Sequence, residues 1–443
     1  MIRRWISKIF RQTSSQNPTP RILGPRQHTI RREQIHPCAL KVTRTLRDAG
    51  YSAFIVGGAV RDLLLGGTPK DFDIATDALP DTVRGLFRRS RIIGRRFQIV
   101  HCYCDNDTIE VTTFRAAEEG GADDGRETAD DGLILRDNVF GTHPEDAARR
   151  DFTVNALYYD PEHEEVWDFH GGVEDTKKRV LRMIGDADER FREDPVRMLR
   201  AARFSAKLDF HIDPATRAPI ARLAPMLERI PRARIFDEMM KLLLSGHAER
   251  GLHQLRAEGL HHGVLPMLDA ALDDPAHKPF LHAILHDTDT RIREGRSASP
   301  AFMLAGLLWF PFRALWKKHY DNEPQAMYAA MDDALEEQRE ALAFPRRLDG
   351  TIKEIWSLQP RFEQRGGSRP FRLLPHPRFR AAYDFLLLRA HGGDVATELV
   401  EWWERFQNAS EAERQEMLLP DSGPRKRRRK NNRKPRSQSP ESA

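Results

Sequence analysis

Two aspartates that follow a glycine pair are the residues of this chain best placed to do chemistry. Asp71 and Asp73 are one residue apart, and Gly57 and Gly58 lie shortly before them. Side chains at positions i and i+2 of an extended strand point the same way, so both carboxylates should converge on one place. Glycines let backbone N–H groups approach a phosphate closely, and carboxylate oxygens bind divalent metals. The pattern predicts a site for a metal and a triphosphate, as phosphoryl or nucleotidyl transfer requires.

Two further residues near this pair each have two open interpretations. Glu110 stands in the middle of a predicted strand, where a carboxylate is costly unless it faces solvent, a cation or a metal. It is therefore either a third carboxylate of the metal site or an outward-facing surface residue. Arg61 lies one turn into the short helix after the glycines. It either reaches the phosphates or pairs with Asp62.

Residues 149–157 form a second polar segment. In this segment Arg150 could hydrogen-bond a ribose or a phosphate, and Asp151 could orient it or hold sugar hydroxyls. The alternative is an ordinary helix N-terminal cap.

Residues 193–204 form a third segment, in which Asp194 precedes Pro195 and predicts a helix N-cap with proline at the first helical position. Arginines follow at three-residue steps: Arg197, Arg200 and Arg203. An aspartate acceptor and an arginine donor one turn apart could read the edge of a base, and the later arginines could hold phosphates or an RNA strand. A solvated basic helix face is the alternative.

The elements that must position these residues are short. Hydrophobic spacing predicts a helix at 39–49, a strand at 52–56, a helix at 59–65, a strand at 72–75 and a hairpin of strands 97–103 and 108–114. Residues 116–132 are acidic and have no apolar period, which predicts a mobile loop. Beyond about residue 175 helical patterns run to about residue 416, with 180–184 as the last strand candidate.

Charge is distributed unevenly along the 443 residues, whose net charge is +5. Residues 1–32 carry eight Arg/Lys and no acid, and residues 424–443 carry nine Arg/Lys and one Glu. The intervening body is therefore acidic, and the two basic ends should attract a polyanion. We expect both ends to be disordered, although the first eleven residues could instead form a membrane-surface helix or a transit peptide.

Three cysteines, Cys38, Cys102 and Cys104, are too few and too oddly numbered for a disulfide framework. The pair at 102 and 104 has no second pair with which to hold a metal. We expect buried, reduced thiols in a cytosolic protein. No apolar run reaches the roughly 18 residues that a membrane span needs.

Four segments together resemble a known family. Residues 57–62, 71–73, 149–156 and 193–197 read Gly-Gly-Ala-Val-Arg-Asp, Asp-Phe-Asp, Arg-Arg-Asp-Phe-Thr-Val-Asn-Ala and Glu-Asp-Pro-Val-Arg. They are similar, in the same order, to the motifs of the class II nucleotidyltransferases, which comprise bacterial poly(A) polymerases and CCA-adding tRNA nucleotidyltransferases. Residues 94–98, with two arginines, residues 375–384 and the basic tail look like the poly(A) polymerase branch.

The resemblance implies an α+β fold, with an N-terminal nucleotidyltransferase head on a small mixed β-sheet and all-helical neck and body domains. It implies template-independent transfer of AMP from ATP to the 3′-hydroxyl of RNA, with release of pyrophosphate. Asp71 and Asp73 would hold Mg²⁺, or Mn²⁺, and Asp151 would be a further active-site aspartate beside our own candidate, Glu110. Nucleotide-binding positions carried over by the motifs, together with Gly57, are Gly58, Arg61, Arg150, Asp194, Arg197, Arg200 and Arg203.

The expected organisation has five parts: a basic disordered arm (1–34), the catalytic head (35–172), a helical neck with the nucleotide-binding helix (173–235), a helical RNA-binding body (236–420) and a basic disordered tail (421–443). Loose RNA binding is expected from the tail residues Arg425, Lys426, Arg427, Arg428, Arg429 and Lys430. We expect a cytoplasmic monomer that binds ATP and RNA 3′ ends. RNA chaperones, degradosome components and peripheral membrane contact by the arm are further candidate partners.

Two other functions stay open at this point. A CCA-adding enzyme would share the motifs but would also accept CTP and prefer tRNA ends. A non-catalytic RNA-binding adaptor would keep the fold, although intact Asp71 and Asp73 argue against it.

Overall fold

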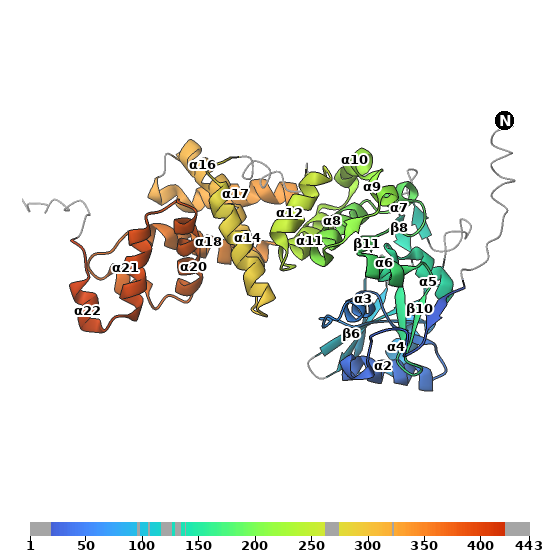
Figure 1. Cartoon of the computed structure of the whole chain (residues 1–443). Helices are drawn as coiled ribbons and strands as arrows, with labels where there is room; N and C mark the ends of the chain where they lie inside the picture. Colours follow the sequence, from blue (N-terminus) through green and yellow to red (C-terminus); the bar gives the residue numbers. More distant parts are fainter. Residues whose placement is uncertain are drawn as a thin grey trace, which may run out of the picture.

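A sheet-bearing head and a long helical part make up the chain (Figure 1). The computed structural model describes residues 19–94, 98–104, 107–116, 126–128, 134–137, 139–261, 274–320 and 323–420. In Figure 1 the head lies at one end and α22 (Glu411–Glu416) at the other, with α8 (Val196–Leu208) and α11 (Arg232–Leu243) between them.

Within the described residues, eight strands form one mixed sheet in the order β1-β10-β9-β2-β3-β6-β5-β4. Their bounds are β1 Arg21–Leu23, β2 Ala53–Val56, β3 Asp73–Thr76, β4 Ser90–Ile93, β5 Ile99–Cys104, β6 Asp107–Thr113, β9 Leu157–Asp160 and β10 Glu165–Asp168. Neighbouring strands pair antiparallel except β3 and β6, which are parallel. The mixed sheet expected for the head is therefore confirmed.

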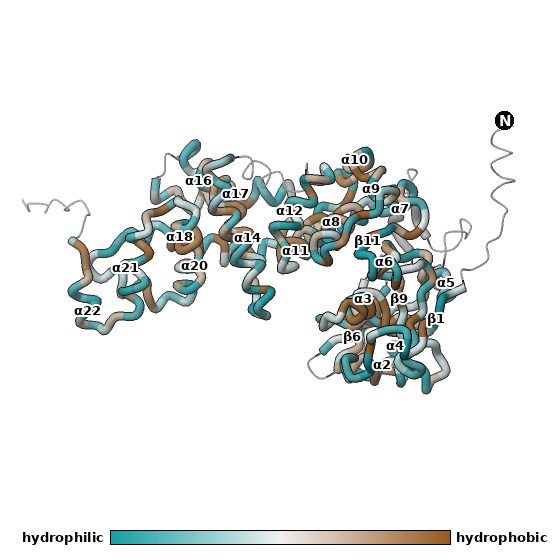
Figure 2. The backbone as a smooth tube through the Cα atoms, in the orientation of Figure 1, coloured by the Kyte–Doolittle hydropathy of each residue, from teal (hydrophilic) through white to brown (hydrophobic). Residues whose placement is uncertain are grey.

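Apolar side chains project from both faces of the central strands, so a hydrophobic core packs against each face of the sheet. One face packs against α2 (Pro37–Asp48), α3 (Gly58–Leu64) and α4 (Pro80–Leu86). On the other face a smaller cluster includes Phe54, Tyr158 and Ala147 of α5 (His143–Arg149). All four residues of β2 are buried, as expected for a central strand covered on both sides. In Figure 2, α3 and the strands beside it are among the hydrophobic parts of the head.

The second part of the chain is helical. Its helices are α6 Gly172–Lys178, α7 Ala187–Glu193, α8, α9 Pro214–Arg217, α10 Ile220–Leu223, α11, α12 Ala248–Ala257, α14 Lys278–Arg293, α15 Pro300–Leu307, α16 Trp309–Tyr320, α17 Met327–Leu342, α18 Asp349–Phe362, α19 Arg369–Leu373, α20 Phe379–His391, α21 Thr397–Asn408 and α22. Short 3₁₀ turns are η2 (Thr153–Asn155), η3 (Ala224–Arg229), η4 (Pro324–Ala326) and η5 (Arg346–Leu348). One buried cluster runs from Phe152 to Leu388, and a second lies between residues 358 and 406. The boundary expected at residues 235 and 236 thus falls inside a shared core, and the five-part division stays a prediction.

Three local expectations are wrong. Residues 19–34 were assigned to a disordered arm, but they contribute β1, which pairs with β10 at the sheet edge, and η1 (Arg32–Gln34). The expected loop at 116–132 contains β7 (Arg126–Thr128), which pairs with β8 (Ile134–Asp137). In the helical part, β11 (Val180–Leu181) confirms the strand candidate at 180–184, but it pairs in parallel with a strand that was not expected, β12 (His211–Ile212). Backbone pairing, which composition does not report, decides all three.

The cysteine expectation is also corrected. Cys38 and Cys104 form a disulfide, and Cys102 is free and buried. The bridge joins the start of α2 to the end of β5 across 66 positions of sequence. Among the described residues, no helix is both long and apolar enough to cross a membrane. Residues 1–18 and 421–443, which include the arm and the tail at 425–430, lie outside the described residues, as do Arg95, Arg96 and Phe97.

Candidate active site

Asp73 is the first residue of β3 and lies at the centre of a group of acids that we call the carboxylate cluster: Asp71, Asp73 and Glu110. In the sheet register Asp73 is directly opposite Glu110 of β6. Burial, the negative charge of Glu110 and, to a smaller extent, that of Asp71 raise the pKa of Asp73 to about 6. Asp71 is exposed and precedes the strand, which begins at Asp73. Their proximity, but not the expected shared strand, is therefore confirmed.

Glu110 fits both interpretations of its role. It faces Asp73 across the parallel strand pair, yet about half of its side chain is exposed and its Oε1 lies 3.2 Å from Nε2 of His101 on β5. The histidine can neutralise part of its charge when protonated. Among the described residues, no group of three or more His, Cys, Asp or Glu side chains is arranged to hold a metal. The role of Glu110 as a third ligand therefore stays a prediction.

The donor set of Asp71 and Asp73 suits Mg²⁺. This ion is usually held by one or two carboxylates together with water and substrate phosphates rather than by a closed protein cage. The mutual repulsion that raises the pKa of Asp73 is also the kind of strain that a bound cation relieves. Two carboxylates beside the glycine turn fit that requirement.

The turn between β2 and α3 lies beside these acids. Gly57 has φ of 73°, a conformation that glycine adopts at little cost, and α3 begins at Gly58. A Cβ atom at Gly57 would lie 3.6 Å from Nη1 of Arg150 and from the carbonyl oxygen of Asn155. The guanidinium of Arg150 therefore lies over the turn, where an anionic group would approach it.

Arg150 is held in this position by buried partners. Its Nε and Nη2 donate to Oδ2 of Asp146 at 3.2 and 3.0 Å, and Nε also donates to Tyr158 Oη at 2.9 Å. Tyr158 Oη in turn donates to Asp146 at 2.6 Å. The positive charge of Arg150 opposes the rise in the pKa of Asp73. One fixed arginine thus serves both the glycine turn and the carboxylate cluster.

Arg61 points into the protein, and only 2% of its side chain is exposed. Its Nη1 donates to Oδ1 of Asn155 at 2.5 Å, and its Nε and Nη2 donate to Asp62 at 2.9 and 2.6 Å. The guanidinium also lies 5.3 Å from the ring centre of Phe204 on α8. Pairing with Asp62, one of the two open interpretations, is present, and nucleotide contact by Arg61 stays a prediction.

Asp151 belongs to a chain of polar contacts that joins the head to α8 and α11, which we call the head–neck seam. Its Oδ1 accepts from Asn155 at 3.0 Å, and its Oδ2 accepts from Nε and Nη2 of Arg200 at 2.8 and 2.7 Å. Burial alone would raise the pKa of Asp151, but the charge of Arg200 and these hydrogen bonds lower it to about 2. The seam continues from Arg200 to Glu238 of α11.

The motif at 193–197 is built differently from the expectation. Asp194 ends α7 and is not the N-cap of α8, which is Pro195, because the helix begins at Val196. The carboxylate of Asp194 accepts two hydrogen bonds from Arg234 of α11, at 3.1 and 2.9 Å. Such a bidentate pair fixes the orientation of the carboxylate.

The three arginines of α8 all have carboxylate partners within the protein. Arg197 donates from Nη1 to Glu193 Oε2 at 2.7 Å and to the carbonyl oxygen of Arg190 at 2.8 Å. Arg203 donates to Glu238 at 3.2 Å and, like Arg200, lies over the ring of Phe204. Arg197 thus faces α7, and Arg200 and Arg203 face the head and α11, so the alternative of a purely solvated basic face is wrong.

Three family models match the chain: the poly A polymerase head domain at residues 53–182, a probable RNA- and SrmB-binding site of polymerase A at 209–272, and the polymerase A arginine-rich C-terminus at 320–437. The poly(A) polymerase I of Salmonella typhimurium is 43% identical over 436 residues, which cover 96% of this chain and 93% of that protein. The chain belongs to the poly(A) polymerase I family. This family consists of nucleotidyltransferase enzymes, and the similarity extends over 96% of the chain.

The other branch of the wider group is similar over a shorter stretch. A CCA-adding enzyme of Geobacillus thermodenitrificans is 41% identical over 222 residues, which cover 50% of this chain and 53% of that enzyme. The crystal structure of the Bacillus stearothermophilus CCA-adding enzyme in complex with CTP has a TM-score of 0.56 and 29% identity, covering 84% of this chain and 82% of that chain. The poly(A) polymerase I family and the CCA-adding enzymes thus share this fold.

Several residues of the site in this poly(A) polymerase I family member were missed by sequence reasoning. Asn155 lies inside the segment at 149–157 but was not singled out. The others supply the counter-charges that hold the motif residues: Asp146, Arg190, Glu193, Arg234 and Glu238. A usable signal was present in α11, where Arg234 and Glu238 stand four residues apart and so lie on one face of the helix.

Proposed function

We propose that the chain is a template-independent RNA polymerase that transfers AMP from ATP to the 3′-hydroxyl of RNA and releases pyrophosphate. The observation that carries this proposal is the position of Asp73, opposite Glu110 and beside Asp71, at the turn over which the guanidinium of Arg150 lies. A cluster of acids beside an arginine-covered glycine turn suits a metal–triphosphate complex. Membership of the poly(A) polymerase I family supports RNA as the acceptor.

Asp71 and Asp73 would hold Mg²⁺, or Mn²⁺, through their carboxylate oxygens. When bound, the ion lowers the pKa of the attacking hydroxyl and offsets charge on the triphosphate. Arg150 would bind the phosphates over the turn formed by Gly57 and Gly58. Arg61, whose donors are directed at Asn155 and Asp62, would act mainly by holding α3 against the seam.

The base would be selected by Asp194 and Arg197, since no template strand is involved. Arg234 fixes the carboxylate of Asp194, and Glu193 fixes the guanidinium of Arg197. A donor and an acceptor with fixed positions can both hydrogen-bond only to a base whose own acceptor and donor are placed to match. A base with the opposite arrangement leaves these groups unpaired, so the site discriminates strongly between bases. Asp151 and Arg200 would keep α8 in register with the head, and Arg203 would contribute positive charge toward the RNA strand.

The division into an arm, a head, a neck, a body and a tail remains part of the proposal, with β1 and η1 assigned to the head rather than to the arm. The basic run at 425–430 would hold RNA through its phosphates without reading sequence. A match to the arginine-rich C-terminal family model at 320–437 supports this assignment. Action in the cytoplasm as a monomer, and contact with RNA chaperones or a degradosome, stay predictions.

A CCA-adding activity is the second candidate. It is supported by the fold that the chain shares with the CTP-bound Bacillus stearothermophilus enzyme. The deciding experiment incubates the purified protein with a generic RNA, Mg²⁺ and each nucleoside triphosphate separately. Long products from ATP alone support the proposal. Products that need CTP and stop after a few additions would instead establish the CCA-adding activity.

The adaptor hypothesis is tested in the same assay. An adaptor would fail to elongate RNA whichever nucleotide and metal ion were supplied. It would still bind RNA and retard it in a gel. Activity that is present in the wild type and unchanged in Asp71→Asn and Asp73→Asn would contradict the metal assignment but not the polymerase activity.

A further inference from the structure

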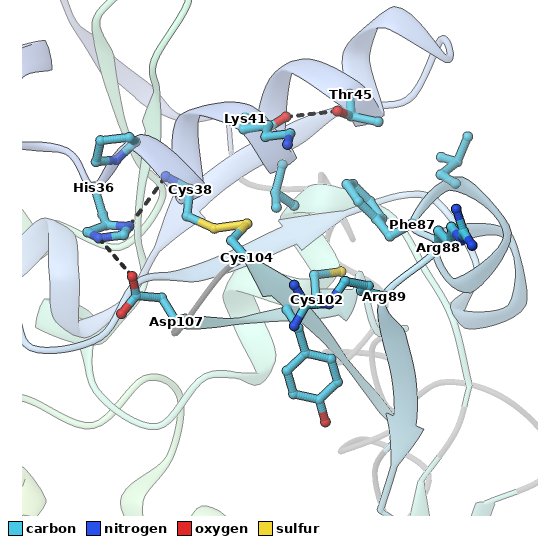
Figure 3. Close-up of a pocket in the computed structure, with 14 residues that line it drawn as sticks. His36, Cys38, Lys41, Thr45, Phe87, Arg88, Arg89, Cys102, Cys104 and Asp107 are labelled. Carbon is cyan, nitrogen blue, oxygen red and sulfur yellow. Dashed lines mark hydrogen bonds and ion pairs between the residues drawn. A yellow bond between two sulfur atoms is a disulfide. The ribbon is translucent and has the colours of Figure 1, made fainter.

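A pocket on the head, remote from the proposed nucleotide site, contains all three cysteines. It has a volume of about 510 Å³ and lies between α2, the end of α4 and β5 (Figure 3). Cys102 and the partly buried Cys104 pack on the α2 side of the sheet, whereas His101, which directly precedes Cys102, pairs with Glu110. Alternation along β5 therefore puts the cysteines and the carboxylate cluster on opposite faces of the sheet. The pocket needs an explanation of its own.

The sulfur atoms in this pocket have different environments. Cys38, in the first turn of α2, is bonded to Cys104 at the end of β5, with a Cα–Cα distance of 6.1 Å, which lies within the usual range for disulfides. Cys38 is 6% exposed, and Cys104 is more accessible. Cys102 is 2% exposed, and burial raises the pKa of its thiol to about 12. Cys102 therefore stays a protonated, inert thiol, and the exchangeable pair is Cys38 and Cys104.

The groups around the bridge favour negative charge. Cys38 is the second residue of a twelve-residue helix, and its own N–H already donates to Nδ1 of His36. The helix dipole at this end stabilises a thiolate. Lys41 lies one turn further on, and the exposed Arg88 and Arg89 line the pocket from the end of α4. The acid among the lining residues, Asp107, lies 3.4 Å from Nε2 of His36. Figure 3 shows the bridge between the helix that carries Lys41 and the strand that carries Cys102.

We propose that this pocket is a thiol–disulfide exchange site, at which the Cys38–Cys104 bridge is opened and closed by a small anionic thiol and its disulfide, of the class of cysteine-containing peptides that carry free carboxylates. The cationic rim supplied by Lys41, Arg88 and Arg89 would take the carboxylates. The inference is independent of the proposed polymerase activity.

Opening proceeds by two exchange steps. The incoming thiolate attacks Sγ of Cys104, the more accessible sulfur, and Cys38 leaves as a thiolate at the start of α2. A second small thiolate then attacks the outer sulfur of the mixed disulfide, which frees Cys104 as a thiolate and releases the small disulfide. The protein bridge gains two electrons and, on protonation, two protons, and two small thiols are oxidised to one disulfide. Closing is the reverse, with the small disulfide as oxidant.

The structural consequence concerns the β5–β6 hairpin. The bridge ties α2 to the end of β5, and β5 pairs with β6, which carries Glu110. Opening the bridge removes a cross-link over 66 positions of sequence, so the unfolded chain regains conformational freedom and the head becomes less stable. We expect the melting temperature of the full chain to fall by roughly 5–10 °C when the bridge is open.

The first test uses the full-length protein equilibrated at several ratios of reduced to oxidised glutathione, then alkylated and digested. Mass spectrometry should find the Cys38–Cys104 peptide pair under oxidising ratios and two alkylated thiols under reducing ones. Cys102 should react only after denaturation, and Cys102→Ser should leave the bridge intact. Three cysteines that are alkylated equally at every ratio would overturn the proposal.

The second test concerns the class of thiol. Opening rates are compared for glutathione, which is anionic, and cysteamine, which is cationic, at equal thiolate concentration. Glutathione should be roughly fivefold faster, as expected for an ion pair near a protein surface. The double variant Arg88→Glu/Arg89→Glu should remove or reverse this preference, whereas Arg88→Lys/Arg89→Lys should keep it. An unchanged ratio in the charge-reversed variant would rule out the proposed anion selectivity.

Discussion

Asp73 in the head and Asp151 at the head–neck seam are both aspartates withdrawn from solvent, yet their pKa values move in opposite directions. Burial and the neighbouring carboxylate of Glu110 raise the pKa of Asp73 to about 6. The pKa of Asp151 falls to about 2 because Arg200 and hydrogen bonds outweigh the effect of burial. At the head–neck seam, where two parts of the protein must be held in a fixed arrangement, the protein itself supplies a positive charge for the aspartate. In the carboxylate cluster beside the glycine turn, the counter-charge would come with the metal.

The same contrast extends to neighbouring residues. At the seam, Asp194 pairs with Arg234, Glu193 with Arg197, and Glu238 with Arg203. In the carboxylate cluster, the positive charge that acts on Asp73 is that of Arg150, which is engaged by Asp146, and Glu110 lies beside His101. An acid that pairs internally contributes to stability, whereas acids that repel one another reduce it. Substitutions in the two regions should therefore separate activity from stability.

The largest effect is expected from Asp71→Asn and Asp73→Asn. Loss of either carboxylate removes a proposed metal ligand worth several kcal/mol in the transition state, so AMP incorporation should fall about a thousandfold. The melting temperature of Asp73→Asn at pH 7.5 should not fall, because a repelled charge has been removed. Primer extension and thermal melting on the same preparation check both results.

Glu110→Gln is the matched control for this prediction. Its carboxylate is opposite Asp73 but half exposed and paired with His101, so the loss of activity should be smaller. A loss as large as that of Asp73→Asn would make Glu110 a true third ligand. Full activity of Asp73→Asn would remove the metal site from the cluster altogether.

At the seam the larger effect should be on stability. Asp151→Asn leaves the largely enclosed guanidinium of Arg200 without its charged partner, which should lower the free energy of unfolding by about 3 kcal/mol. The pKa of Asp151 is depressed, so its stabilisation is present above the unfolded value near 4 and is lost as the pH falls toward 2. The difference between wild type and variant in urea titrations should therefore shrink with acidification. An equal difference at pH 3 and pH 7 would contradict this assignment.

Much of the carboxylate cluster could be predicted from sequence because its signals are local. The glycine turn, α3 and the start of β3 all fall between residues 57 and 73. β-Branched residues marked the strand that carries Glu110, and its parallel pairing with β3 places it opposite Asp73. The strand was expected to begin at residue 72 but begins at Asp73. This places Asp71 before the strand, although it is still close to Asp73.

The seam could not be predicted because its partners are far apart in sequence. Arg234 is forty residues from Asp194, and Glu238 is thirty-five residues from Arg203; no local pattern states that they meet. The capping rule also misled at Asp194, because Pro195 adopts helical dihedral angles and becomes the N-cap itself. The pairing of the short strand β1 with β10 could not be predicted either, because β10 is distant in the sequence. The basic composition around β1 indicated a disordered arm instead.

Arg234 tests whether the seam also controls nucleotide choice. Arg234→Ala would free the carboxylate of Asp194 to rotate, so the ratio of kcat/KM for ATP to that for CTP should fall about tenfold, as expected from loss of a charge-assisted hydrogen-bonded pair. Arg234→Lys keeps the charge but loses the two-pronged geometry and should give an intermediate ratio. A ratio unchanged in both variants would mean that the Asp194–Arg234 pair serves stability alone.

The smallest effect is expected in the pH dependence of metal binding, and it distinguishes the two aspartates directly. With a pKa of about 6, Asp73 is mostly ionised at pH 7.5 and mostly protonated at pH 5.5, so Mg²⁺ affinity measured by calorimetry should be roughly fourfold lower at the lower pH. Asp151, with a pKa of about 2, stays ionised over this range and contributes nothing to the change. In Glu110→Gln a major source of repulsion is absent, the pKa of Asp73 falls, and the pH dependence should flatten. A pH dependence that survives this substitution unchanged would show that the charge of Glu110 does not set the affinity of the cluster.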